Sequence, residues 1–454
     1  MVGAAMGVSR TRIEEIAARE RRRFVELRPK STALRERARA SMPNGVPMSW
    51  MRFFYDPPPV YVVEGRGSRF RDVDGIEYAD FNLADMSMFC GYAPEPIVRA
   101  VSERVAAGSQ FMLGTEDAVW VAEELGRRWG LPKWQFTLSA SQANTEAIRI
   151  ARTMTKRDRV LVFDGKYLGH FDDVLVELRD GNLVPEENGL PTSVTEHIHI
   201  VQFNDSNALR CALAHEDIAL VLTEPALTNV VGLLLPEDRF HAELRAATRK
   251  TGTLLAYDET HTQVFGRGGL VRAWGLDPDM VTMGKSIAGG IPLGAYGMTT
   301  EVSRALEDDD AVADGHPPVA TGGTLFGNPL SMAAARAALG EVLTDEAYQH
   351  THRLGTRLAD GIEQAIRDIG LPWTVHRLGP RSGVTFASTR PRTALDAYAA
   401  RDLLLMHTAW TYLANRGIWE ALIGAGPTCA IPATEEDIDH YIAEYRSLLL
   451  EIVA

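Results

Sequence analysis

The spacing of hydrophobic residues predicts different elements in different parts of the chain. Over residues 1–40 they recur at helical spacing, which predicts one or two amphipathic helices. Next come short runs rich in β-branched and aromatic residues, which predict an antiparallel meander with a turn at 72–75. The strands expected there are 60–63, 68–72 and 77–81.

From residue 134 onward, strand-like and helix-like runs alternate. The expected strands are 134–138, 159–163, 197–203, 218–223, 254–257 and a run ending at Gly284. The helices expected between and beyond them are 142–155, 238–251, 331–343 and 435–452. The strands are apolar without strict alternation, which is typical of a mostly parallel sheet buried on both faces. We therefore expect an α/β fold whose ligands bind beyond the carboxyl ends of the strands.

The length of 454 residues predicts more than one substructure. We expect an N-terminal segment at 1–80, a large domain at 81–330 and a smaller C-terminal domain at 331–454. The segments from both termini are expected to form smaller lobes around the central domain.

Composition excludes several classes of protein. With 45% hydrophobic and 24% charged residues the chain is typical of soluble globular proteins, and its net charge of −13 argues against a nucleic-acid partner or an anionic membrane surface. The arginine-rich run 19–23 includes Glu20 and is interpreted as a solvated helix face. Cys90, Cys211 and Cys429 lie far apart, which predicts neither a disulfide framework nor a metal site. No apolar run is long enough for a signal peptide core or a membrane span, so we expect a cytoplasmic protein.

The candidate nucleophile is Lys285. Only six of the 47 basic residues are lysines, and Lys285 alone follows an apolar strand and precedes several small residues, Ser286, Ala288, Gly289 and Gly290. Burial lowers the pKa of an amine, and a neutral amine can attack an aldehyde. The alternative is a strand-end lysine that points into solvent.

Four other strand ends carry polar side chains. The segment Ser139, Ala140 and Ser141 begins a helix and offers hydroxyls and free N–H groups to a phosphate, although an ordinary serine N-cap has the same pattern. Tyr167 could lie on a heteroaromatic ring or close a core edge. Glu224 and Asp258 each follow an apolar strand and need a cationic partner, either an arginine or a pyridinium N–H.

The motifs stand in one order along the chain: S-A-S-Q-A at 139–143, G-K-Y-L-G at 165–169, E-P-x-x-x-N at 224–229, D-E-T at 258–260, G-K at 284–285 and G-G-T at 322–324. In this order the chain resembles the class III aminotransferases, which are fold type I enzymes that use pyridoxal 5'-phosphate (PLP). Within that class it resembles the branch that holds glutamate-1-semialdehyde aminomutase and β-amino-acid transaminases. The resemblance covers residues 42–438.

The resemblance implies a role for each motif residue. Lys285 matches the Schiff-base lysine, and Asp258 the acid that pairs with the ring nitrogen. Ser141 matches the phosphate-binding threonine, and Tyr167 the aromatic residue stacked on the ring. Glu224 and Asn229 match residues near the ring hydroxyl and the substrate. Thr324 matches a threonine that reaches the phosphate of the neighbouring subunit, which implies a homodimer with shared active sites.

Some positions depart from the family pattern. Thr260 replaces the valine that packs on the ring, and His261 follows it. Leu168, Ala140 and Gln142 replace the histidine, glycine and acid of their motifs. Because Lys285 already supplies a base, we expect a structural role for His261.

Substrate recognition is less strongly marked. Arg52 is the candidate carboxylate-binding residue, with an ordinary surface residue as the alternative, and no arginine stands near Ile423, where relatives have a second one. The apolar neighbours Trp50, Met86 and Met88 predict a pocket for a hydrophobic or aromatic amine or amino acid, although such clusters also form cores.

The leading hypothesis is a transaminase that moves an amino group by ping-pong chemistry between such an amine and a small keto acid, with Lys285 as the general base. One alternative is an intramolecular aminomutase of the glutamate-1-semialdehyde type, which needs the same cofactor residues. The other is an inactive PLP-fold scaffold.

Overall fold

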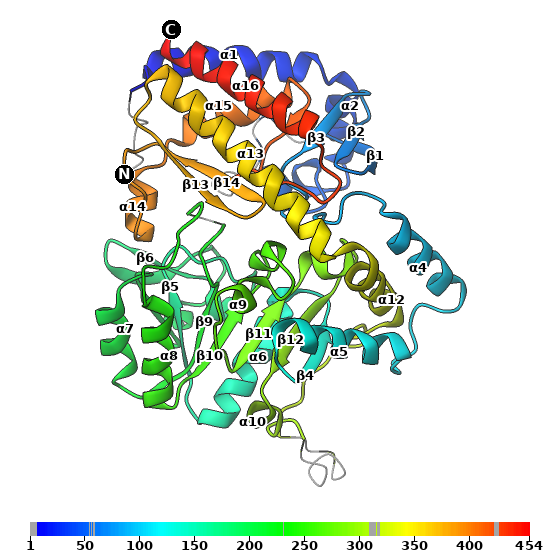
Figure 1. Ribbon diagram of the computed structural model, residues 1–454, viewed down its shortest axis with the longest axis vertical. Coiled ribbons are helices and arrows are strands. Elements are labelled where there is room, and N and C mark those ends of the chain that lie inside the picture. The colour runs from blue at the N-terminus through cyan, green and yellow to red at the C-terminus, as the bar shows by residue number, and fades with distance from the viewer. Residues whose placement is uncertain are drawn as a thin grey trace. The chain divides into compact units, whose positions relative to one another are not determined.

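The computed structural model describes residues 7–53, 55, 57, 60–229, 231–307, 315, 318–421 and 426–454. The chain forms two compact units, which are described separately (Figure 1). The larger unit contains Glu95–Asp345 and Arg392–Ala394. The smaller unit contains Met1–Pro94, Glu346–Pro391 and Leu395–Ala454.

The unit boundaries differ from the expected divisions at 80/81 and 330/331. The segment after residue 80 stays with the smaller unit, because Tyr92 and Gly67 exchange backbone hydrogen bonds at 2.7 and 3.0 Å. Helix α12 (Pro329–Ala337) belongs to the larger unit, because it packs against α4 (Glu95–Ala106) and α5 (Glu116–Trp129).

The larger unit is built on a seven-stranded sheet in the order β4-β12-β11-β10-β9-β5-β8. All neighbouring pairs are parallel except those of β12, which runs antiparallel to both β11 and β4. The strands are β4 (Lys133–Thr137), β5 (Arg159–Phe163), β8 (Ile198–Val201), β9 (Ile218–Thr223), β10 (Leu254–Asp258), β11 (Met280–Met283) and β12 (Gly294–Met298). The mostly parallel α/β sheet expected from the sequence is confirmed.

Strand β12 was not expected from its composition. It begins with Gly294, where a Cβ atom would lie 2.2 Å from the Ser139 carbonyl oxygen and 2.3 Å from Thr137 Oγ1. Only glycine allows β12 to approach β4 so closely, so this residue type marks close packing rather than a turn.

Helices pack against this sheet. Helix α6 (Ala140–Thr155) contacts five of its strands, and Ala143, Ala147 and Ile150 are buried in the core. Further elements of the unit are α7 (Ser206–Leu213), α8 (Phe240–Thr251), α9 (Gly269–Ala273), α10 (Thr300–Ser303) and the hairpin of β6 (Val176–Arg179) and β7 (Asn182–Pro185). The apolar stripe of α6 therefore fixes its first turn beside the carboxyl ends of the strands.

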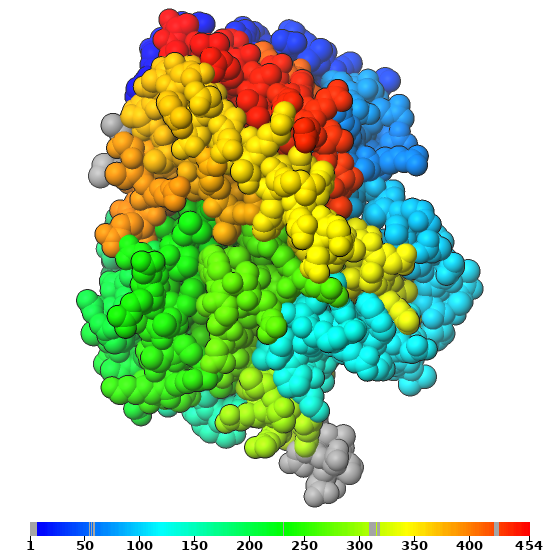
Figure 2. Space-filling model, viewed as in Figure 1, coloured from blue at the N-terminus to red at the C-terminus, as the bar shows by residue number. Residues whose placement is uncertain are grey.

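The smaller unit joins both ends of the chain in one sheet of order β1-β2-β3-β15. The expected meander forms as β1 (Val62–Arg66), β2 (Arg69–Asp72) and β3 (Glu77–Asp80), and β15 (Ile418–Trp419) pairs parallel with β3. Further elements are α1 (Arg10–Glu26), α2 (Pro29–Ala38), α3 (Trp50–Phe53), α13 (Asp345–Ile369), β13 (Thr374–Leu378), β14 (Arg381–Thr385), α14 (Ala394–Ala399), α15 (Leu403–Ala414) and α16 (Glu435–Val453). Helices α13 and α16 lie side by side at the surface (Figure 2), where Arg357 pairs with Asp439 at 2.8 Å.

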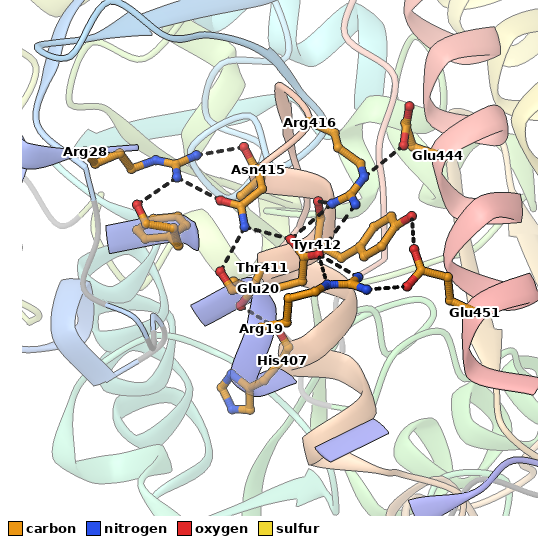
Figure 3. Close-up of polar contacts among 12 residues, drawn as sticks. Arg19, Glu20, Arg28, His407, Thr411, Tyr412, Asn415, Arg416, Glu444 and Glu451 are labelled. Carbon is orange, nitrogen blue, oxygen red and sulfur yellow. Dashed lines mark hydrogen bonds and ion pairs between the residues drawn. The ribbon is translucent and has the colours of Figure 1, made fainter. Parts of the chain in front are cut away.

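A buried polar network ties α1 to the end of α15 (Figure 3). The Glu20 carboxylate is fully buried and accepts hydrogen bonds from Asn415 Nδ2 at 2.9 Å and Arg416 Nη1 at 3.2 Å. The Asn415 amide oxygen accepts in turn from Arg28 Nη1 at 2.9 Å. The interpretation of run 19–23 as a solvated face is therefore wrong for Glu20, because two arginines and an amide replace its hydration.

Candidate active site

Lys285 follows β11 and begins a short 3-10 turn, Lys285–Ala288. Its backbone is in the left-handed region with φ 53°, a conformation that disfavours residues with a Cβ and recurs at functional sites. A Cβ on Gly284 would lie 3.0 Å from the Ala140 backbone nitrogen, so the glycine lets the end of β11 approach the first turn of α6. The lysine is thereby held beside the segment expected to bind phosphate.

Asp258 ends β10 and is 2% exposed. Its Oδ1 accepts a hydrogen bond from the Thr260 N–H at 2.8 Å, and its Oδ2 accepts from Asn144 Nδ2 at 2.7 Å. Burial raises the pKa of the Asp258 carboxyl, although these hydrogen bonds act in the opposite direction. Both donors are neutral, so a cationic ligand such as a pyridinium N–H would stabilise the ionised form of this acid.

The first turn of α6 offers hydroxyl groups. Ser139 is the N-cap residue, and its Oγ accepts from the Gln142 N–H at 3.3 Å. Ser141 Oγ accepts from the His170 N–H at 3.1 Å, which leaves the hydroxyl proton for a ligand oxygen. The first N–H groups of a helix have no partner within the helix, so this turn can hold a phosphate.

Tyr167 lies in the loop that follows β5 and is partly buried. Its ring centroid is 6.3 Å from that of His261, with the two planes tilted by 34°. The carbonyl oxygen of Leu168 accepts from Asn144 Nδ2 at 2.7 Å, which fixes the Tyr167 loop to α6.

Glu224, Asn229 and His261 meet beyond β9 and β10. The amide nitrogen of Asn229 donates to His261 Nε2 at 3.4 Å, so His261 Nδ1 carries the proton and faces Glu224 Oε2 at 3.5 Å. The same carboxylate oxygen accepts from the Thr228 hydroxyl at 2.7 Å. Glu224 Oε1 is buried and has no hydrogen-bond partner among the described residues. This orphaned oxygen indicates a place for a ligand donor beside Asn229.

Thr260 and Lys285 are connected through Gln263, which the sequence did not single out. Its Nε2 donates to the Thr260 carbonyl at 3.0 Å and to the Gly284 carbonyl at 2.7 Å. Thr260 is 8% exposed. The buried amide therefore sets the distance between the segment after Asp258 and the lysine turn.

Two more residues, the buried Glu259 and the partly buried His241, support this edge of the sheet. The Glu259 carboxylate accepts from the Leu270 and Val271 N–H groups, at 3.3 and 2.5 Å, and burial raises its pKa to about 7. His241 joins Tyr257 to Pro225 through its two ring nitrogens. Neither Glu259 nor His241 was assigned a role from the sequence, because their hydrogen-bond partners lie elsewhere in the chain.

The structure does not bring every candidate into this cluster. The side chain of Thr324 is exposed, and its carbonyl oxygen accepts from Gln110 Nε2. Trp50, Arg52, Met86 and Met88 all belong to the smaller unit.

The substrate candidates have contacts of their own in the smaller unit. Arg52 Nη1 donates to the Tyr55 carbonyl at 2.9 Å. Met86 is 2% exposed, and Arg381 Nη1 lies 3.5 Å from its Sδ, whereas Trp50 and Met88 are partly buried. Ile423 lies outside the described residues. The substrate-binding roles therefore stay predictions.

The remaining cluster fits PLP. Asp258 offers a buried carboxylate to the ring nitrogen, the start of α6 offers a seat to the phosphate, and Glu224 Oε1 lacks a donor within the described chain. These features, with a strand-end lysine, define a fold type I enzyme that uses PLP.

Comparisons with known proteins identify the family. The model of the family described as aminotransferase class-III matches residues 53–432. The glutamate-1-semialdehyde 2,1-aminomutase 2 of Brevibacillus brevis is 32% identical over 432 residues, which cover 93% of this chain and 98% of that protein. The chain belongs to the class III aminotransferase family of PLP-dependent enzymes.

Solved structures place the chain in the expected branch. A glutamate-1-semialdehyde-aminomutase from Pseudomonas aeruginosa PAO1 is 37% identical with a TM-score of 0.92, covering 98% of this chain and 100% of that chain; one of its structures is a complex with PMP. An omega-transaminase from Sphaerobacter thermophilus is 30% identical with a TM-score of 0.85, covering 93% of this chain and 98% of that chain.

Proposed function

We propose that this chain is a PLP-dependent aminomutase of the glutamate-1-semialdehyde type, which moves an amino group within one small amino aldehyde. The similarity to the Pseudomonas aeruginosa aminomutase, 37% identity with a TM-score of 0.92 over 98% of the chain, carries the proposal. It favours the alternative drawn from the sequence over the leading hypothesis of a transaminase.

When bound, PLP supplies a carbonyl carbon that takes up amino groups and a ring that accepts the electron pair released at the substrate carbon. Asp258 would keep the ring nitrogen protonated. Its buried carboxylate is an anion, and an anion stabilises the positive charge of the protonated ring nitrogen. Lys285 would move a proton at Nζ to and from the substrate carbon that bears the amino group. The hydroxyls of Ser139 and Ser141, with the first N–H groups of α6, hold the phosphate.

Tyr167, Thr260, Asn229 and Glu224 complete the proposed site. Tyr167 and Thr260 would contact the cofactor ring, and the Asn229 amide would donate a hydrogen bond to the ring hydroxyl oxygen. Glu224 orients Asn229 through His261, since its Oε2 lies 3.5 Å from His261 Nδ1. These contacts support a structural role for His261.

Transamination between a hydrophobic amine and a small keto acid is the second candidate function. The omega-transaminase from Sphaerobacter thermophilus, 30% identical with a TM-score of 0.85, supports it. Met86 is buried, as expected either for a residue that contacts an apolar substrate or for a core residue. Arg52 would bind a substrate carboxylate in either reaction.

Product analysis separates the two functions. Purified enzyme loaded with PLP or PMP is given glutamate-1-semialdehyde alone, and the products are followed by mass spectrometry and NMR. An aminomutase converts it to the isomeric amino ketone without an added acceptor. Turnover only when an amine and pyruvate or 2-oxoglutarate are both present would overturn the aminomutase and support the transaminase. The Lys285→Ala variant is the control in both assays and should be inactive.

We further propose that the protein is a homodimer in which Thr324 reaches the site of the partner subunit. Gln110 Oε1 accepts from the Phe111 and Met112 N–H groups at 2.8 and 3.2 Å, and its Nε2 donates to the Thr324 carbonyl. The exposed side chains beside this anchor are large and apolar: Phe111, Met112, Leu113 and Leu325 at 50%, 73%, 74% and 49% exposure. A second copy of the chain would remove this apolar surface from water.

Sedimentation velocity of the double variant Met112→Asp, Leu113→Asp tests the dimer. The variant should sediment as a monomer while the wild type sediments as a dimer, and an unchanged dimer would contradict the interface. A cytoplasmic location stays an expectation from the sequence, in which the three cysteines lie far apart. Among the described helices, none has the length and apolar character needed to cross a bilayer.

A further inference from the structure

Asn144 lies in the second turn of α6 and is completely buried. Its Nδ2 donates to the Leu168 carbonyl and to Asp258 Oδ2, both at 2.7 Å, and its Oδ1 accepts from the Thr282 hydroxyl at 2.5 Å. A carbonyl oxygen can only accept, so the Leu168 contact fixes which way the amide faces. The Asn144 nitrogen, not its oxygen, therefore points at Asp258.

These three contacts join four parts of the site. Asn144 shares its helix with the phosphate seat at Ser139, and Leu168 is adjacent to Tyr167 in the loop after β5. Thr282 lies on β11 three residues before Lys285. The Asn144 amide therefore links four segments of the proposed site. They are the segments expected to bind the phosphate, to contact the ring, to pair with the ring nitrogen and to carry Lys285.

The amide also supplies a neutral donor to a buried acid. Asp258 is 2% exposed, and Asn144 Nδ2 and the Thr260 N–H each donate to a different oxygen of its carboxylate. A hydrogen bond to the charged form of an acid favours that form. Removing the Asn144 donor would leave Oδ2 and the Leu168 carbonyl without their partner in a buried place, which is costly.

We propose that Asn144 is a positioning residue of the PLP site, which holds the ionised Asp258 carboxylate in line with the ring nitrogen and registers it against the phosphate seat and the Lys285 strand. This inference rests on the PLP chemistry of the family and not on the substrate. It can therefore succeed or fail independently of the aminomutase proposal.

The test uses the full-length enzyme reconstituted with PLP labelled with ¹⁵N in the ring. The ¹⁵N chemical shift reports whether the ring nitrogen is protonated, and equilibrium dialysis gives the PLP dissociation constant. We expect Asn144→Ala to raise that constant by roughly 5- to 150-fold, because Asp258 Oδ2 loses its donor. The ring ¹⁵N signal should move toward the unprotonated position.

Two further variants keep the test decisive if Asn144→Ala folds poorly. Thr282→Val removes the hydroxyl that orients the amide with little change of shape, and should shift the ¹⁵N signal in the same direction by a smaller amount. Asn144→Asp places a second carboxyl 2.7 Å from Asp258, where two carboxylates cannot both ionise, and should change the pH at which the ring nitrogen titrates.

The matched control is Asn415→Ala, which removes another buried amide that makes two-sided hydrogen bonds, in the smaller unit. It should lower thermal stability while leaving the PLP dissociation constant and the ¹⁵N signal unchanged. If the Asn144 and Thr282 variants lose stability in the same way, with the ring nitrogen protonated as in the wild type, Asn144 is only a structural residue and the proposal is overturned.

Discussion

The Tyr257 hydroxyl donates a hydrogen bond to His241 Nδ1 at 2.8 Å, and His241 Nε2 donates to the Pro225 carbonyl oxygen, also at 2.8 Å. Tyr257 precedes Asp258 and Pro225 follows Glu224, so one imidazole on α8 connects the ends of β10 and β9. Only the neutral imidazole can donate from Nε2 and accept at Nδ1. The connection therefore depends on the protonation state of His241.

The first prediction concerns acid sensitivity at His241. Burial lowers the pKa of His241 to about 4, whereas the ordinary value is about 6.5. A base with a depressed pKa contributes its stability fully above about pH 6.5 and loses it as pH falls through about 4. Between about pH 7 and pH 5 this group should lower the free energy of unfolding by about 2 kcal/mol. Urea unfolding at the two pH values measures the loss.

The variant His241→Gln should be less stable than the wild type at neutral pH but should lose less on acidification. His215→Gln, at an exposed histidine, is the control and should follow the wild type at both pH values. Equal losses for His241→Gln and the wild type would show that His241 does not carry the pH dependence.

The second prediction concerns Gly169. Its φ is +107°, and a Cβ there would lie 2.3 Å from Ser141 Oγ and 2.9 Å from the Ser141 Cα. Gly169→Ala must displace the first turn of α6, which is proposed to hold the phosphate. We expect PLP to bind at least tenfold more weakly, since loss of about 1.4 kcal/mol has that effect.

Gly181→Ala is the matched control for Gly169→Ala. Gly181 has φ +79° in the turn between β6 and β7, and a Cβ there meets nothing within 4 Å. It imposes the same kind of backbone strain without a clash. Both variants should lose stability, but only Gly169→Ala should lose PLP affinity in a fluorescence titration.

The third prediction concerns Glu420, which follows β15. Its carboxylate accepts from the Ala421 N–H at 2.8 Å and from the Tyr441 hydroxyl, and burial raises its pKa to about 7. Below the ordinary pKa of about 4.3 the group is protonated in both the folded and the unfolded state. As pH rises toward 7 only the unfolded state ionises, so folding loses up to about 3 kcal/mol of stability.

Glu420→Gln should flatten this part of the stability profile between about pH 4.5 and pH 7.5, as measured by chemical unfolding. Glu436→Gln, at an exposed position of α16, should leave the profile unchanged. If stability falls as steeply with pH in Glu420→Gln as in the wild type, a group other than Glu420 causes the pH dependence.

The strands and the motif residues at their ends could be predicted because both are local signals. An apolar run followed by Asp258 or by Gly284 and Lys285 is readable from a few consecutive residues, and the structure places these residues at the same edge of one sheet. The class of fold and the cofactor could be predicted from the residues at the carboxyl ends of the strands, because parallel strands bring these residues to one edge of the sheet.

The supporting residues could not be predicted, because their partners are far apart in sequence. Asn144 meets Asp258 across 114 positions, and Glu20 meets Asn415 across 395. A buried amide or a buried acid looks like any surface residue in a one-dimensional pattern until its donors are known. The need for glycine at position 294 could not be predicted either, because only contacts with the neighbouring strand exclude a side chain there.

The last prediction concerns a left-handed turn in the smaller unit. Leu83, Ala84, Asp85 and Met86 have φ values of 56°, 47°, 55° and 69°. The turn is held by the buried carboxylate of Asp80, whose Oδ1 accepts from the Asn82 and Leu83 N–H groups, both at 2.9 Å. Each non-glycine residue in this conformation costs about 1–2 kcal/mol, so the local hydrogen bonds hold a strained backbone that presents Met86.

Ala84→Gly should relieve this strain. Ala84 is exposed, so its methyl group contributes little packing, and glycine adopts φ > 0 readily. The free energy of unfolding should rise by roughly 1 kcal/mol. Ala18→Gly, at an exposed position inside α1, is the control and should instead lower stability by about 1 kcal/mol, because glycine is unfavourable in a helix. Opposite signs for the two variants in urea unfolding would establish strain at 83–86, whereas a loss of stability in both would refute it.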